Sequence, residues 1–394
     1  MFKVTRTFQP VGQGAFYSES LRLNDKQSFN VVYDCGSKEK IDWLRTRIAN
    51  TGFPTKRKVD VCFLSHFHAD HYKGIETLNP NIIILPLLKE WDKVIFWIGH
   101  QLGMSSFNAN FEEELHKKLP NAKLFRISPT DEEVGNPTFI ETYNITQLSN
   151  SGNPNILPSG TKFTFGKECD WIYIPINPCL DKEIVNTFLN LINDPKKGLD
   201  IEKLKSLDTV YFNTKKTTLK NIYSKIGSPN EYSMAVYSGP INFNDVVYRS
   251  KIFPITPSCE LRRCPFWEHR YYTQYFNPGC LYLGDMNLNN MLEPLKIIYK
   301  FIGNDCQNYI GTIQVPHHGS KDNFNPLLLW SYILEEDRWE PRKDPLIFVI
   351  SVGENNTYGH PSSFLIEELV NSGNYIKLVT EKSTSLLMEE YELE

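Results

Sequence analysis

The sequence predicts an α/β fold whose functional side chains lie on loops at the ends of strands. Short apolar runs that are typical of buried strands alternate with stretches of helical periodicity. Polar residues directly follow several of these runs, among them VDVCFL at 59–64 and LIFVISV at 346–352. Since a packed strand holds the loop at its end firmly, such loops are common positions for binding and catalytic residues.

The expected elements follow from these apolar patterns. Strands are expected at residues 2–7, 29–33, 59–64, 81–88, 233–237, 281–283, 312–315 and 346–352. Helices are expected at residues 40–49, on the spacing of their apolar residues, and at 361–370. Residues 1–394 are interpreted as one catalytic domain with insertions at roughly 90–230 and 245–279.

The composition indicates a globular protein with a sizeable core. The chain has 394 residues, of which 41% are hydrophobic, and a formal net charge of -4. This mild acidity argues against a protein that coats nucleic acid with its whole surface, although it leaves room for a local basic groove. The eight cysteines form no CxxC pair and are interpreted as reduced, packed thiols. Neither a signal peptide nor a membrane-spanning stretch is recognised, so a cytoplasmic protein without a membrane partner is expected.

The strongest chemical signal is the segment SHFHADH at residues 65–71, which directly follows an apolar strand. Zinc and manganese are bound by nitrogen and oxygen donors that converge on a small volume. A loop after a strand can direct His66 and His68 to one metal ion, and Asp70 and His71 to a second ion beside it. The alternative is an accidental cluster of surface histidines, which the density of these residues after a buried strand disfavours.

Further candidate ligands follow other expected strands. Asp285 ends one of them, and a carboxylate there can bridge two cations about 3.5–4 Å apart. His317 and His318 follow a second such strand, and His360 follows a third. The histidines outside these segments are isolated and are therefore left out of the site.

These residues resemble a known family. HFHADH is similar to the HxHxDH signature of the metallo-β-lactamase superfamily. The chain resembles more specifically the metallo-β-lactamase domain of the competence channel protein ComEC and its stand-alone relatives, through motifs in the order VGQG, YDCGS, SHFHADH, LGDMN, VPHHGSK and SVGENNTYGHP. The resemblance is weak between about residues 80 and 230. It implies a four-layer αββα sandwich with two β-sheets flanked by helices, and a hydrolase that uses two divalent metal ions.

The resemblance also implies the ligands of the two ions, zinc or manganese: His66, His68, Asp70, His71, Asp285, His318 and His360. The first ion takes the first two histidines of HFHADH together with one of His317 and His318. The second ion takes the aspartate and the last histidine of HFHADH together with His360, and Asp285 bridges both ions. His318 is favoured as the ligand and His317 as a catalytic or supporting group, but the sequence leaves the assignment of this pair open.

Three residues are expected to act in the reaction, which would use a hydroxide that bridges the two metal ions. Asp70 would orient this hydroxide as well as bind metal. His317 would donate a hydrogen bond or a proton to the leaving oxygen. Asp34 matches the aspartate of the family's first motif and would orient a ligand histidine, the alternative being an ordinary turn aspartate. One departure is Ala15, because ComEC-like domains usually have an aspartate after VGQG.

Two basic stretches favour a phosphodiester substrate, with DNA or RNA as the leading example. Residues 196–225 contain eight lysines, among them Lys215 and Lys216, and three acidic residues. Arg262 and Arg263 precede a run of aromatic residues that suits the stacking of exposed bases. The alternatives are a solvated helical face for the lysines, and a packed insertion or a partner surface for the arginines.

Ser320 and Lys321 directly follow the histidine pair and would contact phosphate, unless they form an ordinary polar helix start. The function expected from sequence is therefore that of a metal-dependent phosphodiesterase or nuclease. Two alternatives stay open. One is a hydrolase of small molecules such as cyclic nucleotides, phosphate esters or carboxylic esters, and the other is an effector whose insertions bind a partner protein that gates its activity.

Overall fold

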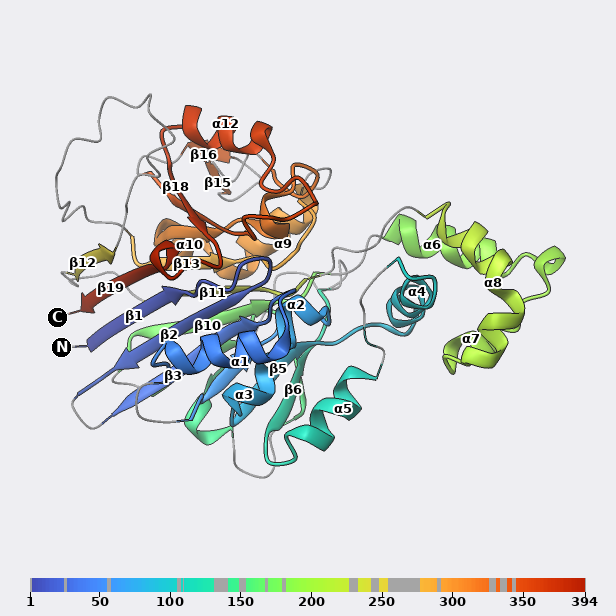
Figure 1. Cartoon of the computed structure of the whole chain (residues 1–394). Coiled ribbons are helices and arrows are strands. Elements are labelled where there is room, and N and C mark those ends of the chain that lie inside the picture. The colour runs from blue at the N-terminus through green and yellow to red at the C-terminus, as the bar shows by residue number, and fades with distance from the viewer. Residues whose placement is uncertain are drawn as a thin grey trace.

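Two large β-sheets lie face to face at the centre of the protein, with helices on their outer sides (Figure 1). The computed structural model describes residues 2–24, 27–54, 58–104, 108, 110–130, 141–148, 154–166, 169–178, 182–226, 233–241, 248–253, 277–288, 292–325, 331–333, 339–341 and 345–393.

The order of the strands defines the two sheets. The first sheet has nine strands in the order β12 (Tyr248–Phe253), β19 (Leu387–Leu393), β1 (Phe2–Phe8), β2 (Phe16–Arg22), β3 (Ser28–Cys35), β4 (Val61–Phe63), β5 (Ile82–Pro86), β6 (Lys123–Ile127) and β8 (Ile156–Leu157). The second has eight in the order β18 (Tyr375–Val379), β17 (Ile347–Ser351), β14 (Ile310–Gln314), β13 (Gly279–Tyr282), β11 (Ala235–Pro240), β10 (Trp171–Ile176), β9 (Lys162–Thr164) and β7 (Thr142–Asn144). A separate hairpin pairs β15 (Ser331–Ile333) with β16 (Trp339–Pro341).

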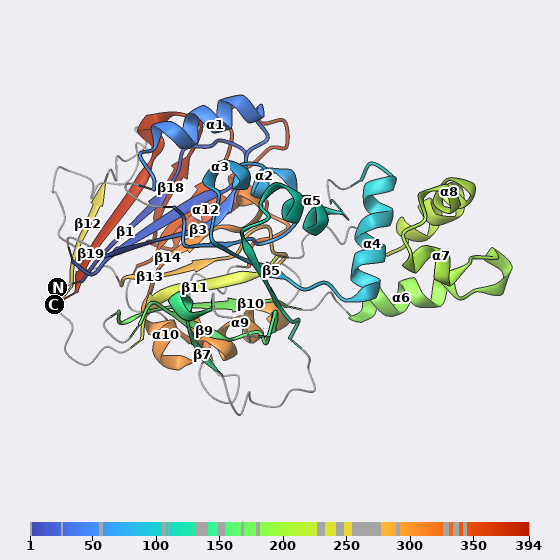
Figure 2. The ribbon, with the colours of Figure 1, turned by 90° about the horizontal axis from the view of Figure 1, so that it is seen from below.

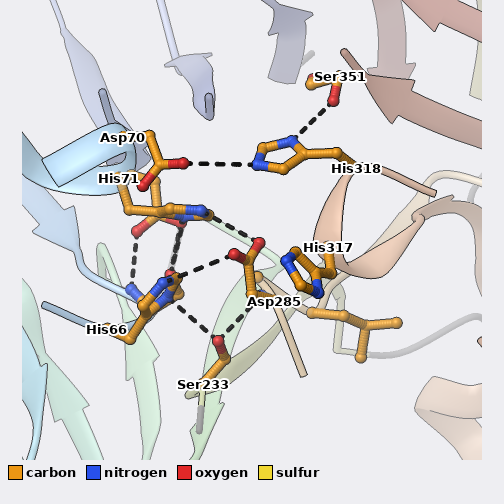
Figure 3. A network of polar contacts seen from close by, with 12 residues as sticks. His66, Asp70, His71, Ser233, Asp285, His317, His318 and Ser351 are labelled. Atoms are coloured by element: carbon orange, nitrogen blue, oxygen red, sulfur yellow. Dashed lines mark hydrogen bonds and ion pairs between the residues drawn. The ribbon is translucent and has the colours of Figure 1, made fainter. Parts of the chain in front are cut away.

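Parallel pairing of neighbouring strands places the predicted polar strand ends at the same edge of each sheet. In the first sheet β3, β4, β5 and β6 run parallel, and in the second sheet β13, β14, β17 and β18 run parallel. The carboxyl ends of parallel strands meet at one edge of their sheet, where α/β proteins bind ligands. The polar segments that follow β4, β13 and β14 therefore lie close together although they are far apart in sequence (Figure 3), and Asp34 at the end of β3 contacts the first of them.

Apolar side chains fill three layers, as the alternation of side chains along a strand requires. Val31 of β3 packs between the two sheets, whereas its neighbour Val32 packs against the helices outside the first sheet. That outer cluster includes α1 (Ile41–Asn50), and the outer cluster of the second sheet includes α9 (Leu292–Ile302) and α12 (Ser363–Asn371). Helix, sheet, sheet and helix therefore follow one another, which confirms the predicted αββα sandwich (Figure 2).

The remaining helices cover the sandwich or stand beside it. Shorter helices on the sandwich are α2 (Ala69–Tyr72), α3 (Ile75–Leu78), α5 (Phe111–Lys118) and α10 (Asn304–Asn308). A helical lobe projects beside the sandwich in Figures 1 and 2 and consists of α4 (Glu90–Gln101), α6 (Lys182–Ile192), α7 (Ile201–Lys205) and α8 (Thr209–Tyr223). None of the helices in the described residues is long and apolar enough to cross a membrane.

The region expected as a long insertion, roughly 90–230, divides between the sandwich and the helical lobe. Its middle part forms β6 and β8 of the first sheet and β9 and β10 of the second, so it completes both sheets. The shorter expected insertion, 245–279, contributes β12 to the edge of the first sheet, and its residues 254–276 lie outside the described part of the chain.

A buried ion network joins the two sheets. Arg6 of β1 is fully buried, and it donates hydrogen bonds of 2.7 Å to Glu19 of β2 and to Glu389 of β19. Glu19 also accepts hydrogen bonds of 2.7 Å from hydroxyl groups of the second sheet, on Tyr173, Ser238 and Tyr282. Since charge in the interior is stable only with its partners in place, the network fixes how the sheets face each other.

Replacing Arg6 with methionine is expected to lower the free energy of unfolding by about 3–5 kcal/mol, because Glu19 and Glu389 would stay buried without their cation. Urea denaturation followed by circular dichroism measures the change. The control is Lys3→Met on the same strand. Lys3 pairs with Glu390 at 3.1 Å nearer the surface, and its loss should cost less than about 1 kcal/mol. Equal stability of the two variants would contradict the role of the network.

Candidate metal centre

Two glycines let the turns beneath the candidate metal centre pack closely. A Cβ atom at Gly36 would lie 2.2 Å from the carbonyl carbon of Asp70, and one at Gly14 would lie 2.5 Å from the carbonyl oxygen of Gly36. The backbone N–H of Ala15 donates to the carbonyl oxygen of Asp70 at 3.1 Å. The position at which the sequence departs from the ComEC-like pattern therefore supports Asp70 through its backbone.

Asp34, at the end of β3, orients His71. Its buried carboxylate accepts hydrogen bonds from the backbone N–H of Ser65 at 2.7 Å and from the hydroxyl of Ser65 at 2.6 Å, and it lies 2.7 Å from Nδ1 of His71. Because the carboxylate accepts, Nδ1 of His71 carries a proton. Nε2 then faces Oδ1 of Asp285 at 3.1 Å. A carboxylate behind a histidine in this manner is the usual arrangement of metal-binding histidines.

Two serines hold His66. Its Nδ1 lies 2.8 Å from the hydroxyl of Ser65 and 3.2 Å from the hydroxyl of Ser233, so that Nε2 faces Oδ2 of Asp285 at 3.8 Å (Figure 3). Ser233 also accepts a hydrogen bond of 2.9 Å from the backbone N–H of Asp285. No motif identifies Ser233 from sequence. Its place is known only from the fold, two residues before β11 begins.

His318 is fixed from the second sheet. Its Nδ1 donates to the carbonyl oxygen of Ser351 at 2.8 Å, and its Nε2 lies 3.7 Å from Oδ2 of Asp70. His317 and His318 both have left-handed backbones, with φ of 47° and 55°, which is uncommon for residues other than glycine. The sharp turn that results points the two neighbouring rings in different directions (Figure 3).

His317 lies next to Asp285 and is held by Asn323. Its Nδ1 is 2.9 Å from the amide oxygen of Asn323, and the amide nitrogen of Asn323 donates to the carbonyl oxygen of Asp285 at 3.2 Å. The structure thus separates the two histidines by contact: His318 faces Asp70, while His317 lies beside Asp285 on the other side of the centre (Figure 3).

The ligand atoms fall into two groups. Within the described residues, the atoms of each group lie within 4.8 Å of one another: His66, His71 and Asp285, and Asp70, His71 and His318. His318 therefore lies with Asp70 and His71, whereas the resemblance implies that one of the histidine pair joins His66 and His68. His318 follows β14 and is held by the carbonyl oxygen of Ser351 at the end of β17, and its ring faces Asp70 of α2.

His68 and His360 flank these groups. The ring of His68 lies 4.5 Å from that of His66, and the ring of His360 lies 5.6 Å from that of His317. Burial, together with repulsion from His317 and His318, lowers the pKa of His360 to about 4. Its imidazole is therefore neutral at pH 7 and available to bind a metal ion or to accept a hydrogen bond.

The buried nitrogens of the centre fit a divalent metal ion. Nε2 of His66 and Nε2 of His318 are buried and have no hydrogen-bond partner within the described residues. Buried polar atoms usually have such a partner. Each nitrogen faces a carboxylate oxygen, at 3.8 Å on Asp285 and 3.7 Å on Asp70. These separations are too long for hydrogen bonds but suit an ion between the atoms, since each metal–ligand distance is about 2.0–2.2 Å.

Burial and neighbouring charges set the ionisation of the centre. Burial lowers the pKa of His66 well below its ordinary value, and repulsion from His71 and His68 lowers it further. Burial also acts to lower the pKa of His71, but the carboxylates of Asp285 and Asp34 outweigh it and raise this pKa well above its ordinary value. Burial acts to raise the pKa of Asp285, yet His71 and the other histidines hold it well below its usual range. Without metal, these shifts favour the neutral imidazole of His66 and the protonated imidazole of His71.

The expected substrate contacts lie in different places. Ser320 is buried and its hydroxyl accepts a hydrogen bond of 3.3 Å from the backbone N–H of Asp322, whereas Lys321 is exposed. Lys215 and Lys216 lie on α8, in the helical lobe and not at the centre (Figure 1). The arginines at 262 and 263 lie outside the described residues.

Comparison with known proteins gives similarity to solved structures alone. No protein-family model matches the chain, and no curated protein sequence matches it significantly. Among solved structures, the chain is similar to the metallo-β-lactamase fold protein YhfI from Bacillus subtilis, with 9% sequence identity, a TM-score of 0.33 and coverage of 98% of this chain and 99% of that chain. What the chain itself shows is an αββα sandwich with buried His and Asp groups that suit divalent metal ions.

Metal binding at pH 7 is expected to release about one proton from His71, because its raised pKa keeps the imidazole protonated until a metal ion takes Nε2. Metal affinity should therefore rise with pH through the neutral range. Isothermal titration in two buffers of different ionisation enthalpy measures the released protons. The Asp34→Asn variant, which removes one of the two carboxylates that raise this pKa, should release fewer. A binding heat that is the same in both buffers would contradict the assignment.

Proposed function

We propose that this chain is a two-metal-dependent phosphodiesterase with DNA or RNA as its leading substrate. The observation that carries the proposal is the pair of buried, unpartnered imidazole nitrogens of His66 and His318, which face the carboxylates of Asp285 and Asp70. Divalent ions bound there would supply water of lowered pKa and would polarise the phosphoryl oxygens of the substrate. Such a centre suits the hydrolysis of a bond as inert as a phosphodiester.

The proposed ligands follow the two groups that the geometry defines. The first ion would be held by His66 and Asp285 with His68 beside them, and the second by Asp70 and His318 with His360 beside them. His71, which belongs to both groups, would lie between the ions together with Asp285. Both N/O donor sets suit zinc and manganese. In this assignment His318 is the metal ligand of the histidine pair, and His317 would not bind metal and would take part in proton transfer.

The other residues of the centre would orient these ligands and move protons. Asp34 keeps Nε2 of His71 directed into the centre, because its carboxylate accepts a hydrogen bond from Nδ1. Asn323 does the same for His317, whose Nδ1 faces the amide oxygen. Nε2 of His317 is then the atom that would hold a proton for the leaving oxygen of the substrate. Asp70 would orient the attacking water through its carboxylate.

The helical lobe supports nucleic acid as the substrate. α8 contains Lys215, Lys216 and Lys220 and no acidic residue, and the side chains of Lys216 and Lys220 are exposed. A basic helical face attracts the phosphate backbone independently of sequence. We therefore assign Lys215 and Lys216 to a contact between the lobe and the nucleic-acid backbone, remote from the bond that is cleaved. Lys321 is assigned to a phosphate nearer the centre.

Asp285→Asn and His68→Ala are each expected to lower kcat/KM for bis-p-nitrophenyl phosphate by about 1,000-fold, because each removes a proposed ligand and with it several kcal/mol of transition-state stabilisation. The assay uses Mn²⁺ and Zn²⁺ separately. The control is Asp42→Asn on α1, whose side chain is 88% exposed and pairs with Arg45, and it should leave the rate unchanged. Undiminished hydrolysis in both ligand variants would overturn the proposed function.

A substrate panel separates nucleic acid from the other substrate classes. It contains linear and circular DNA, RNA, cyclic nucleotides and p-nitrophenyl acetate. Cleavage of DNA or RNA, with binding that weakens steeply as salt is added, would support the proposal because the released counterions make such binding salt-dependent. Turnover of cyclic nucleotides or of the acetate ester alone would favour a small-molecule hydrolase.

A further inference from the structure

Lys38 lies beside the candidate metal centre on a backbone that is held by hydrogen bonds. It follows the turn after β3, and its N–H donates to the carbonyl oxygen of Gln13 at 2.8 Å. The side chain of Gln13 accepts a hydrogen bond of 3.2 Å from the backbone N–H of Gly353, which ties this loop to the one after β17. The hydroxyl of Ser37 adds a hydrogen bond of 2.7 Å to the carbonyl oxygen of Val11. The position of Lys38 is therefore set by the fold.

The ammonium group of Lys38 points inward, at a proposed metal ligand. It lies 3.7 Å from Oδ2 of Asp70, the same oxygen that faces Nε2 of His318 at 3.7 Å. The side chain of Lys38 is 43% exposed whereas that of Asp70 is 8% exposed, so the lysine connects solvent with the centre. This contact joins the basic side chain to the metal-binding groups directly.

An aromatic ring holds the ammonium group in place. The amino nitrogen of Lys38 lies 3.9 Å from the centre of the ring of Tyr358, which is a favourable cation–π distance. Tyr358 in turn lies parallel to His360, with ring centres 6.2 Å apart. Asn356 fixes this loop, because its amide oxygen accepts from the backbone N–H groups of Tyr358 and His360 at 3.2 Å.

The ammonium group of Lys38 beside a metal-bound Asp70 would favour the binding of an anion. Once Asp70 binds a divalent ion, its negative charge is shared with that ion, and the ammonium of Lys38 is left beside a second positive charge. The single negative charge of Asp70 does not balance the divalent ion and the ammonium together, so a further anionic oxygen is favoured beside them. The arrangement of Lys38, Tyr358 and Asp70 thus defines a place for a negatively charged oxygen next to the centre.

We propose that Lys38 binds the anionic oxygen of a substrate phosphodiester and that Tyr358 positions its ammonium group for this contact. Lys38 is then the residue that selects charged phosphodiesters over neutral esters. The inference rests on the proposed function, because it specifies the substrate class of the same centre. It assigns a specificity role to a residue outside the ligand set.

Lys38→Met tests the contact with two substrates that differ in charge. KM for anionic bis-p-nitrophenyl phosphate should rise by about tenfold or more, since a charge-assisted hydrogen bond is lost, while kcat/KM for the neutral triester diethyl p-nitrophenyl phosphate should not fall. The matched control is Lys40→Met, which removes the same charge from an exposed position in the same loop and should affect neither substrate. An equal loss on both substrates, or none on the diester, would overturn the proposal.

Tyr358 is tested by a conservative pair of variants. Tyr358→Phe keeps the ring face and should retain the wild-type KM for the diester. Tyr358→Leu removes the ring face and should raise KM for the diester toward the value of Lys38→Met, because the ring no longer holds the ammonium group. The same KM in both variants would contradict the positioning role of the ring.

A binding measurement separates this inference from the proposed function. Isothermal titration of inorganic phosphate into the Mn²⁺-loaded protein should show about tenfold weaker binding to Lys38→Met than to wild type, with the same metal content in both by elemental analysis. If wild type hydrolyses no diester but this difference is found, the proposed function fails and the anion site stands. If wild type hydrolyses the diester but Lys38→Met binds phosphate equally well, the anion site fails alone.

Discussion

The buried carboxylate of Asp34 is the contact on which the centre depends. It ties the end of β3 to the loop after β4 through Ser65, and it fixes which nitrogen of His71 faces inward. Nε2 of His71 belongs to both candidate ligand groups, so this one orientation serves both. The carbonyl oxygen of Ser351 does the same for His318 from the second sheet. The centre is therefore assembled by groups behind the histidines as much as by the histidines themselves.

The two sheets must hold these groups in register. The proposed ligands come from loops after β4 and β13, which belong to different sheets, so any slip between the sheets would separate His66 from Asp285. The buried network around Arg6 and Glu19 opposes such a slip, because Glu19 accepts hydrogen bonds in fixed directions from hydroxyl groups of the second sheet. The buried network therefore contributes both to the stability of the core and to the geometry of the candidate site.

Much of this could be predicted from local sequence. Apolar runs that end in His or Asp identified the strands and the ligand loops, because burial and metal binding both demand particular residue types. Ser233 and Ser351 could not be identified, since a hydroxyl or a backbone carbonyl carries no such signal and acts here only through tertiary proximity. The pairing of β1 with β19, in which Phe2 lies opposite Leu393, is likewise a long-range contact without a local pattern.

The central claim is that two divalent ions bind at the two groups, with His71 and Asp285 between them. Anomalous diffraction at the manganese edge, from crystals grown with Mn²⁺, tests it most directly. The account predicts two anomalous peaks, one between His66 and Asp285 and one between Asp70 and His318, at about 3.5–4 Å from each other. No peak among these residues, or one peak bound by other side chains, would contradict it.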